Sequence, residues 1–263
     1  MYRIVAIVFF VSTISKVCCA QEVWLRPDKF FYEPGETASI QILTGDEFIG
    51  IPLPLENEEV SFLEHWTRNS NIDLRQGYSR NEKATFPLRL DHEGYQFLFF
   101  KTTRSTNPDA SKFNEMLKQY GLDEIYTERE QRGALEVTPT VINKVFVQLA
   151  LRTGRQHGQG WNKSMNLPIE VIPDKNPQIL KRGERIHFTV LKNGKPAFGV
   201  RVKIWNRWDN RTTIQNIYTE KDGTISTTIS SPGDWMVSVV EMEKGAQENQ
   251  YVAESFNLVF GYR

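Results

Sequence analysis

The clearest pattern along the chain is a short-range alternation of apolar and polar positions. In the segment EPGETASIQILTG, a Pro-Gly turn precedes Ala38, Ile40 and Ile42, which alternate with polar neighbours. A period of two places every second side chain on the same face of a strand, and it predicts strands with one face buried. The segments EEVSFLEHW and KVFVQLALRTG repeat this pattern. The chain is therefore predicted to be mainly β.

One stretch changes to the helical period. Apolar side chains recur on one predicted helix face at Phe113, Met116, Leu117 and Tyr120. Asp109 or Ser111 is placed to cap the start of this helix, and Gly121 stands where a left-handed residue ends one. A second short helix is predicted over residues 122–130. We therefore expect a short helical insertion near residues 109–131.

The second half of the chain follows a turn-rich linker that contains Pro173 and Pro177. Strand-like segments then recur at intervals of about ten to fifteen residues, which is typical of a compact β-sandwich of the immunoglobulin-like type. The dipeptides Asn193-Gly194 and Asp222-Gly223 are predicted hairpin turns, because both tolerate the positive φ that such turns need. In the first half, Asp91–Gly94 is predicted to join two strands in the same way.

These segments divide the chain into two predicted domains. An N-terminal β-sandwich covers residues 21–172 and carries the helical insertion. A C-terminal Ig-like β-sandwich covers residues 173–263. A leader at residues 1–20 precedes both.

The leader has the order of a secretory signal peptide. Arg3 precedes the apolar run Ile4–Val11, which is too short for the ~18–20 residues that span a bilayer, and small or polar residues follow. Cleavage after Ala20 would remove both cysteines of the chain. A lipid anchor is the alternative, but Cys18 follows Val17 where a small residue is needed, and an uncleaved tail is the third option.

Composition narrows the function classes. The chain has 32 basic and 32 acidic residues, so it lacks the concentrated basic face that nucleic-acid binding requires. No segment after the leader is long and apolar enough to be a transmembrane helix. The sequence thus predicts a periplasmic or extracellular protein, soluble or peripheral, that hydrophobic burial stabilises without disulfides.

The densest group of candidate metal ligands lies at the predicted turn of the segment LDHEG. Carboxylate and imidazole groups are ligands for divalent transition ions. Asp91 and His92 of this turn, together with His65 of the segment EEVSFLEHW, are the candidate metal ligands. A solvated turn is the alternative, because adjacent strand residues point to opposite faces.

A second candidate site is the glycine-rich segment RTGRQHGQGWNKS. It combines basic and aromatic groups at Arg155, His157 and Trp161, which suit an acidic glycan, a carboxylate or a phosphorylated ligand. A plain interdomain loop is the alternative. Further on, the segment KIWNRWDNR carries Trp205 and Trp208; one of them is expected in the core, and an exposed Trp208 would suit contact with a sugar or a protein.

Several blocks in order carry a family resemblance. They are QEVWLRPDKF, EPGETASIQILTGDEFIGIPLP, DHEGYQFLFFKTT, KFNEMLKQYGLDEI, LPIEVIPDKNPQILKRGERIHFTVLKNGKPAFGVRV and TEKDGTISTTISSPGDWMVSVVEM. In their order and spacing they resemble the domain of unknown function 4198 family, exported β-rich proteins of bacterial envelopes. The resemblance implies, for some members, a link to nickel or cobalt uptake beside a membrane permease. Those members tend to carry histidines where this chain has Gln21 and Glu241.

Three function hypotheses follow. The first is an exported binding or accessory protein that holds a ligand or a divalent transition metal and serves a transport component of the inner or outer membrane. The second is a structural or interaction module that binds a protein or glycan in the envelope. A hydrolase is the third, and it has little support because the chain lacks the G-x-S-x-G, H-E-x-x-H and phosphate-loop motifs. The chain is therefore predicted not to be an enzyme.

Overall fold

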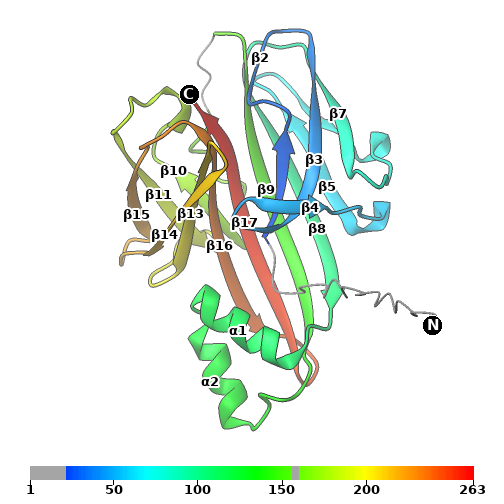
Figure 1. Ribbon diagram of the computed structural model, residues 1–263, viewed down its shortest axis with the longest axis vertical. Helices are drawn as coiled ribbons and strands as arrows, with labels where there is room; N and C mark the ends of the chain where they lie inside the picture. Colours follow the sequence, from blue (N-terminus) through cyan, green and yellow to red (C-terminus); the bar gives the residue numbers. More distant parts are fainter. Residues whose placement is uncertain (1–21, 156–159) are drawn as a thin grey trace, which may run out of the picture.

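The computed structural model describes residues 22–155 and 160–263, and within them the fold is mainly β, as predicted (Figure 1). The predicted signal peptide, residues 1–20, and the candidate ligand His157 lie outside the described residues. Three sheets and two α-helices form the described part of the chain. No helix in the described residues is long and apolar enough to cross a bilayer.

The largest element is a nine-stranded sheet, called here the central sheet. In spatial order it contains β14 (Arg211–Tyr218), β13 (Arg201–Trp208), β16 (Gly233–Lys244), β17 (Gln250–Tyr262), β9 (Thr140–Thr153), β8 (Gly94–Thr106), β5 (Val60–Trp66) and β6 (Asn71–Asp73), with β2 (Phe31–Tyr32) beside the end of β9. Neighbouring strands are antiparallel except at β17–β9 and β2–β9, which are parallel. The β17–β9 pair joins the strands of the two halves of the sequence into one sheet.

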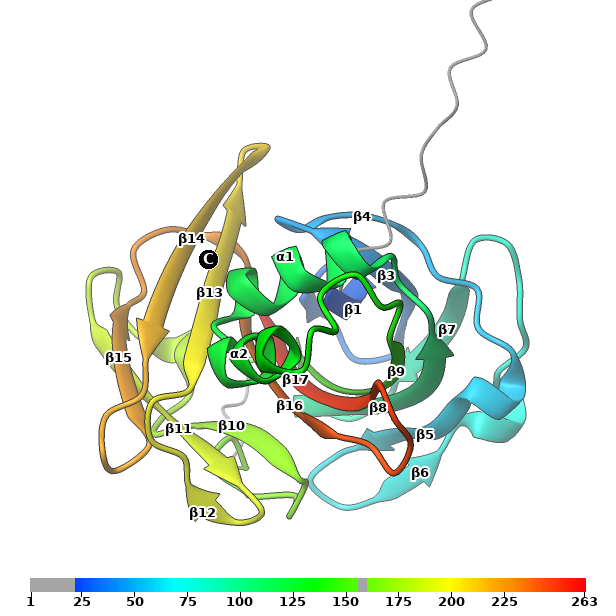
Figure 2. The ribbon, with the colours of Figure 1, turned by 90° about the horizontal axis from the view of Figure 1, so that it is seen from below.

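Two four-stranded sheets flank the central sheet. The N-terminal sheet contains β1 (Glu22–Pro27), β3 (Glu36–Asp46), β4 (Ile49–Pro52) and β7 (Thr85–Leu90). The C-terminal sheet contains β10 (Ile169–Pro173), β11 (Arg185–Lys192), β12 (Lys195–Pro196) and β15 (Thr224–Thr228). Short 3-10 turns occupy η1 (Asn57–Glu59), η2 (Arg75–Gly77) and η3 (Pro177–Ile179). Figures 1 and 2 show the two small sheets on opposite sides of the central one.

Alternation along the central strands explains this three-layer packing. On β9, Val147 and Leu149 share one face, as the alternation predicted, and point into the core under the N-terminal sheet, whereas Phe146 and Ala150 point into the core under the C-terminal sheet. The middle strands are thus buried on both faces, which is why their sequences read as almost continuous apolar runs. The division into two domains at residue 173 stays a prediction; that residue ends β10, which pairs with β11.

Two of the three predicted hairpin turns have a different role. Asn193-Gly194 does join the paired strands β11 and β12, with both residues at positive φ. Asp91–Gly94 instead leads from β7 in the N-terminal sheet to β8 in the central sheet, and Asp222-Gly223 leads from β14 in the central sheet to β15 in the C-terminal sheet. The prediction of hairpins there was wrong because a turn with a glycine at positive φ reverses the chain but does not decide which strand the chain then joins.

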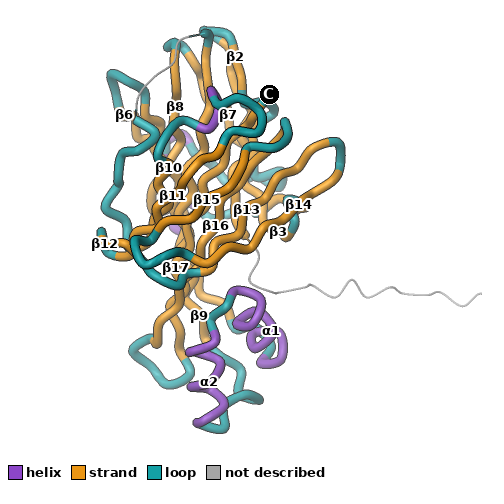
Figure 3. The backbone as a smooth tube through the Cα atoms, turned by 90° about the vertical axis from the view of Figure 1, so that its left-hand side faces the viewer, coloured by secondary structure: helices purple, strands orange, loops and turns teal. Residues whose placement is uncertain are grey.

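The helical insertion lies between β8 and β9, as α1 (Ala110–Tyr120) and α2 (Asp123–Gln131). Its predicted apolar face, from Phe113 to Tyr120, packs against the far ends of β9, β16 and β17. Gly121 ends α1 in the left-handed conformation with φ +69°, as predicted. Figures 1 and 3 show both helices at one end of the molecule, beyond the small sheets.

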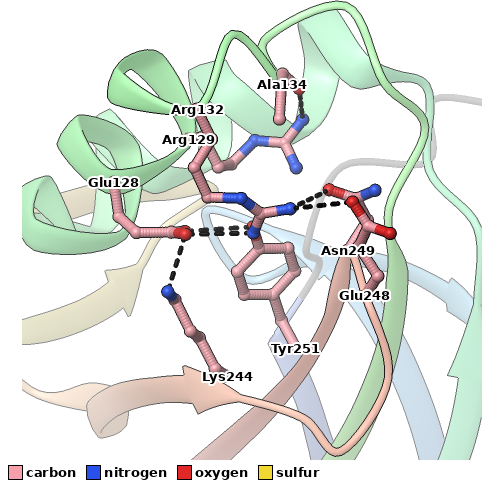
Figure 4. A network of polar contacts seen from close by, with 8 residues as sticks. All are labelled: Glu128, Arg129, Arg132, Ala134, Lys244, Glu248, Asn249 and Tyr251. Atoms are coloured by element: carbon pink, nitrogen blue, oxygen red, sulfur yellow. Dashed lines mark hydrogen bonds and ion pairs between the residues drawn. The ribbon is translucent and has the colours of Figure 1, made fainter.

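Polar contacts fasten α2 to the hairpin of β16 and β17 (Figure 4). Glu128 accepts a hydrogen bond from Arg132 at 3.0 Å and forms an ion pair with Lys244 at 2.7 Å. The fully buried Arg129 stacks between the rings of Phe113 and Tyr251, at 5.0 and 5.6 Å from the ring centroids. The insertion is therefore anchored by a buried cation as well as by apolar contact.

Candidate functional site

A cleft of about 730 Å³ opens on the face of the central sheet that also carries the C-terminal sheet. The C-terminal sheet packs over β16 and β17, and the cleft lies further along the same face, at β5 and β8. Three segments line it: the end of β5 with the turn to β6, the start of β8, and residues 160–165. Segments distant in the sequence thus share one concave surface, the usual setting of a ligand site.

Trp66, the last residue of β5, forms one wall of the cleft. Its indole nitrogen donates a hydrogen bond of 2.6 Å to the carboxylate of Glu64, and its ring meets the edge of Phe99 at 4.8 Å between centroids. Lys163 places its ammonium group 5.2 Å from the centre of the Trp66 ring. The hydrogen bond and the contact with Phe99 therefore hold the indole in place, while a cation stands over its face.

The floor of the cleft comes from alternate residues of β8. Phe97 and Phe99 point toward the cleft, whereas Leu98 and Phe100 between them point into the core under the N-terminal sheet. Behind the floor, Trp161 meets the rings of Tyr95 and Phe97 edge-on at 5.6 and 5.3 Å. Aromatic packing thus makes the floor rigid.

The polar rim is a tight turn between β5 and β6. Thr67 closes it, because its backbone N–H donates to the carbonyl of Ser70 at 2.8 Å and its hydroxyl lies 2.9 Å from that of Ser70. The turn presents Arg68, Asn69 and Asn71 to the cleft. A ligand there would meet amide, hydroxyl and guanidinium groups on a fixed loop.

The opposite rim is held by a buried carboxylate. Glu170 on β10 is only 1% exposed, and it accepts hydrogen bonds from the hydroxyl of Ser164 and, at 2.8 Å, from the backbone N–H of Met165. Lys163 immediately precedes these two residues, so Glu170 fixes the backbone from which the lysine reaches the cleft.

Among the described lining residues, the charged groups are two cations and one carboxylate. Arg68 and Lys163 line it together with Glu93. Neither cation has a carboxylate within 4.0 Å anywhere in residues 22–155 and 160–263. Unpaired cations beside an aromatic wall suit a ligand that carries both hydroxyl groups and an acidic group.

A family model describes most of the chain. Residues 18–243 match the domain of unknown function (DUF4198). The chain belongs to this family. The resemblance in the sequence is thereby confirmed, whereas nothing in the match bears on nickel or cobalt uptake.

Other comparisons add little. No curated protein matches the chain. Among solved structures, α2-macroglobulin of Escherichia coli activated by porcine elastase is 10% identical over 93% of this chain and 22% of its own, with a TM-score of 0.19. Three N-terminal domains of the highly immunogenic outer capsid protein of bacteriophage RB49 are 14% identical over 92% of this chain and 59% of theirs, with a TM-score of 0.16. Both scores are too low to support an argument.

The structure does not gather the candidate metal ligands into one site. The carboxylate of Asp91 is exposed and pairs with Arg89 at 2.7 Å. His65 is buried, with its Nε2 2.7 Å from the side-chain oxygen of Gln96, and burial is the main cause that lowers its pKa. His92 is exposed and supplies a backbone carbonyl to Gln96. Within the described residues, no group of three or more His, Cys, Asp or Glu side chains is placed to hold a metal ion.

The family's metal-linked positions are also occupied differently. Glu241, which stands where those members tend to carry a histidine, pairs with Lys192 at 2.8 Å. Gln21 lies outside the described residues. The described part of the chain therefore offers an ion pair where a metal role would need an imidazole.

The candidate ligand-binding residues fall in separate places. Trp161 is buried, with 4% of its surface exposed, and it supports the cleft from behind instead of lining it. Arg155 is exposed at the end of β9. Trp208 is 55% exposed at the end of β13, away from the cleft, and Trp205 is buried, so one of the two tryptophans is in the core as expected. Among the described residues of the predicted segment, Gly160 and Lys163 belong to the cleft lining.

Proposed function

We propose that the protein is exported and acts as a binding protein for a sugar-like ligand with an acidic group, held in the cleft beside Trp66. The observation that supports this most is the placement of Lys163 over the indole face, next to the amide and hydroxyl groups of the turn at 67–71. A ring with apolar faces and polar edges would pack against the indole and hydrogen-bond to the turn. Its acidic group would neutralise Lys163 and Arg68.

Export rests on the leader. The order of Arg3, an apolar run and small residues up to Ala20 is that of a secretory signal peptide. Amino-terminal sequencing of the protein from the envelope fraction tests this proposal, and a sequence that starts at Met1 would refute it.

Binding is tested by calorimetric titration of the purified protein with matched neutral and acidic oligosaccharides. We expect an acidic member to bind, and the Trp66→Ala variant to bind about five-fold or more weakly, because the stacking of a ring on an aromatic side chain is worth about 1–3 kcal/mol. Trp208→Ala is the matched control, since it removes an exposed indole outside the cleft. Equal losses in both variants would contradict the proposal.

The exposed Trp208 favours a second candidate, an envelope protein partner. It lies beside β14, an outermost strand of the central sheet that also exposes Ile214 (37%) and Tyr218 (53%). An unpaired strand edge with apolar side chains is a site at which a strand of another protein adds to a sheet. A photo-crosslinker at position 218 would capture a membrane transport component if this candidate holds, and position 89 on the other face of the molecule serves as control.

A further inference from the structure

Positive charge gathers in the segment that joins β10 to β11. Residues 175–183, called here the basic end, contain Lys175, Lys181 and Arg182 and no acidic residue. All three cationic residues are exposed. The same segment also exposes Ile179, with 50% of its surface open to solvent. A large aliphatic side chain therefore stands among cations on the surface.

The backbone of the basic end is fastened to the central sheet. The side chain of Gln178 donates a hydrogen bond of 3.1 Å to the carbonyl of Gly261, near the end of β17. The hydroxyl of Tyr262 donates one of 2.9 Å to the carbonyl of Leu180. These bonds hold the residues on both sides of Ile179, so its exposed side chain is presented at a fixed place.

The cations of the basic end have no counter-charge within the described part of the chain. None of the three has a carboxylate within 4.0 Å there. The two acidic residues that flank the segment contact other groups: Asp174 lies 3.3 Å from the ring of His187, and Glu184 accepts a hydrogen bond from the backbone N–H of Lys181. The ammonium and guanidinium groups are thus available to an external anion.

The other end of the molecule has the opposite charge. Residues 107–139, which form the helical insertion, contain seven acidic and four basic residues. Figure 1 shows the two helices and the C-terminus, next to which the basic end is fastened, at opposite ends of the long axis. Such an asymmetry orients a protein in the field of a negatively charged surface, with the basic end toward that surface.

We propose that the basic end docks on a bilayer that contains anionic phospholipids. Phosphate headgroups supply the negative charge that the three cations lack, and each Lys or Arg near such a surface strengthens binding by about five-fold. Ile179 enters the boundary between headgroups and acyl chains. An acidic polysaccharide would pair with the cations but offers no apolar layer to Ile179, so a lipid surface is the occupant that uses both features.

This docking goes beyond the proposed sugar binding and does not depend on it. No described residue of the basic end lines the cleft. Trp66→Ala should therefore lose affinity for the sugar while it binds vesicles as the unchanged protein does.

The test is co-sedimentation of the protein, purified from the envelope fraction, with vesicles. We expect binding to vesicles of phosphatidylglycerol mixed with phosphatidylcholine, and little binding to phosphatidylcholine alone. The double variant Lys181→Gln with Arg182→Gln should bind the anionic vesicles about twenty-five-fold more weakly, because it removes two cations worth about five-fold each. Ile179→Ser should bind about five-fold more weakly, since about half of that side chain is free to be buried.

The matched control is the double variant Lys195→Gln with Lys221→Gln. It removes the same charge from exposed residues at the opposite end of the C-terminal sheet, where Lys195 pairs with Lys192 at the end of β11. We expect it to change vesicle binding by less than about two-fold, because charges further from the surface than a Debye length are screened. The leader is common to all variants, so a retained leader cannot produce a difference between them.

Equal binding to both kinds of vesicle, or equal losses in the two double variants, would overturn the proposal. Binding of dextran sulfate, a soluble anionic polysaccharide, without binding of anionic vesicles would assign the basic end to a glycan and overturn it as well.

Discussion

The buried ion pair of Glu22 and Lys203 allows a quantitative test of how the two halves of the chain are joined. Glu22 begins β1 and Lys203 lies on β13, and their side chains are 2% and 6% exposed, with Nζ 3.3 Å from Oε1. Tyr120 on α1 donates a hydrogen bond of 2.7 Å to the same oxygen, and Nζ lies 3.8 Å from the centre of its ring. One charge pair thus links the N-terminal sheet, the insertion and the central sheet.

Lys203→Met removes the cation and leaves the carboxyl group buried. Loss of one partner of a buried pair costs about 3–5 kcal/mol, so we expect that reduction in the free energy of unfolding at pH 8. Burial raises the pKa of Glu22, and Lys203 opposes this rise, so the variant raises the pKa further. The native variant then keeps a proton on Glu22 that the unfolded chain releases near pH 4.3.

The pH dependence follows from this proton. A carboxyl group with a raised native pKa stabilises the folded state below its unfolded pKa, and this stabilisation is lost as pH rises through the native pKa. The cost of Lys203→Met should therefore be smaller at pH 5 than at pH 8, by about 1.4 kcal/mol for each unit by which the pKa rises. Urea unfolding followed by tryptophan fluorescence at both pH values measures it.

The double variant Glu22→Gln with Lys203→Met is the control. It removes both charges, so it should recover all but about 1 kcal/mol of the loss. A cost below about 1 kcal/mol at pH 8, or an equal cost at both pH values, would refute the reasoning.

Two further changes test the insertion and the rim of the cleft. Arg129→Met should lower the free energy of unfolding by about 3 kcal/mol, because it leaves the carbonyls of Ala134 and Val137 without their buried donor. Urea unfolding measures this free energy, and the control variant Arg68→Met, at an exposed residue, should change it by less than about 0.5 kcal/mol. Glu170→Ala removes the acceptor that holds Ser164 and Met165, so it should weaken sugar binding several-fold while the circular dichroism spectrum stays nearly unchanged. An unchanged affinity in calorimetry would show that this rim does not contribute to sugar binding.

The features that were predicted correctly from the sequence are those that short-range residue patterns determine. Period-two alternation located strands such as β3, β5 and β9, and the spacing from Phe113 to Tyr120 together with Gly121 located α1 and its end. It did not reveal that β17 pairs with β9, because the register of strands about one hundred residues apart is set by tertiary packing. The same limit explains the two turns that proved to be passages between sheets.

The candidate site was only partly visible for a related reason. The glycine-rich segment drew attention to Trp161, yet that ring is buried and the cleft uses Lys163 from the same segment. Trp66 and the turn after it carried no motif. The one available signal was the run FLFF, Phe97–Phe100, whose residues are apolar at successive positions and therefore face two cores, one of which borders the cleft.

A crystal structure of the protein soaked with the tightest-binding acidic oligosaccharide tests the central proposal most directly. The account predicts a sugar ring packed on the indole of Trp66, with its acidic group within hydrogen-bond distance of Lys163 or Arg68. A sugar bound elsewhere, for instance against Trp208, with the cleft holding only solvent, would contradict it.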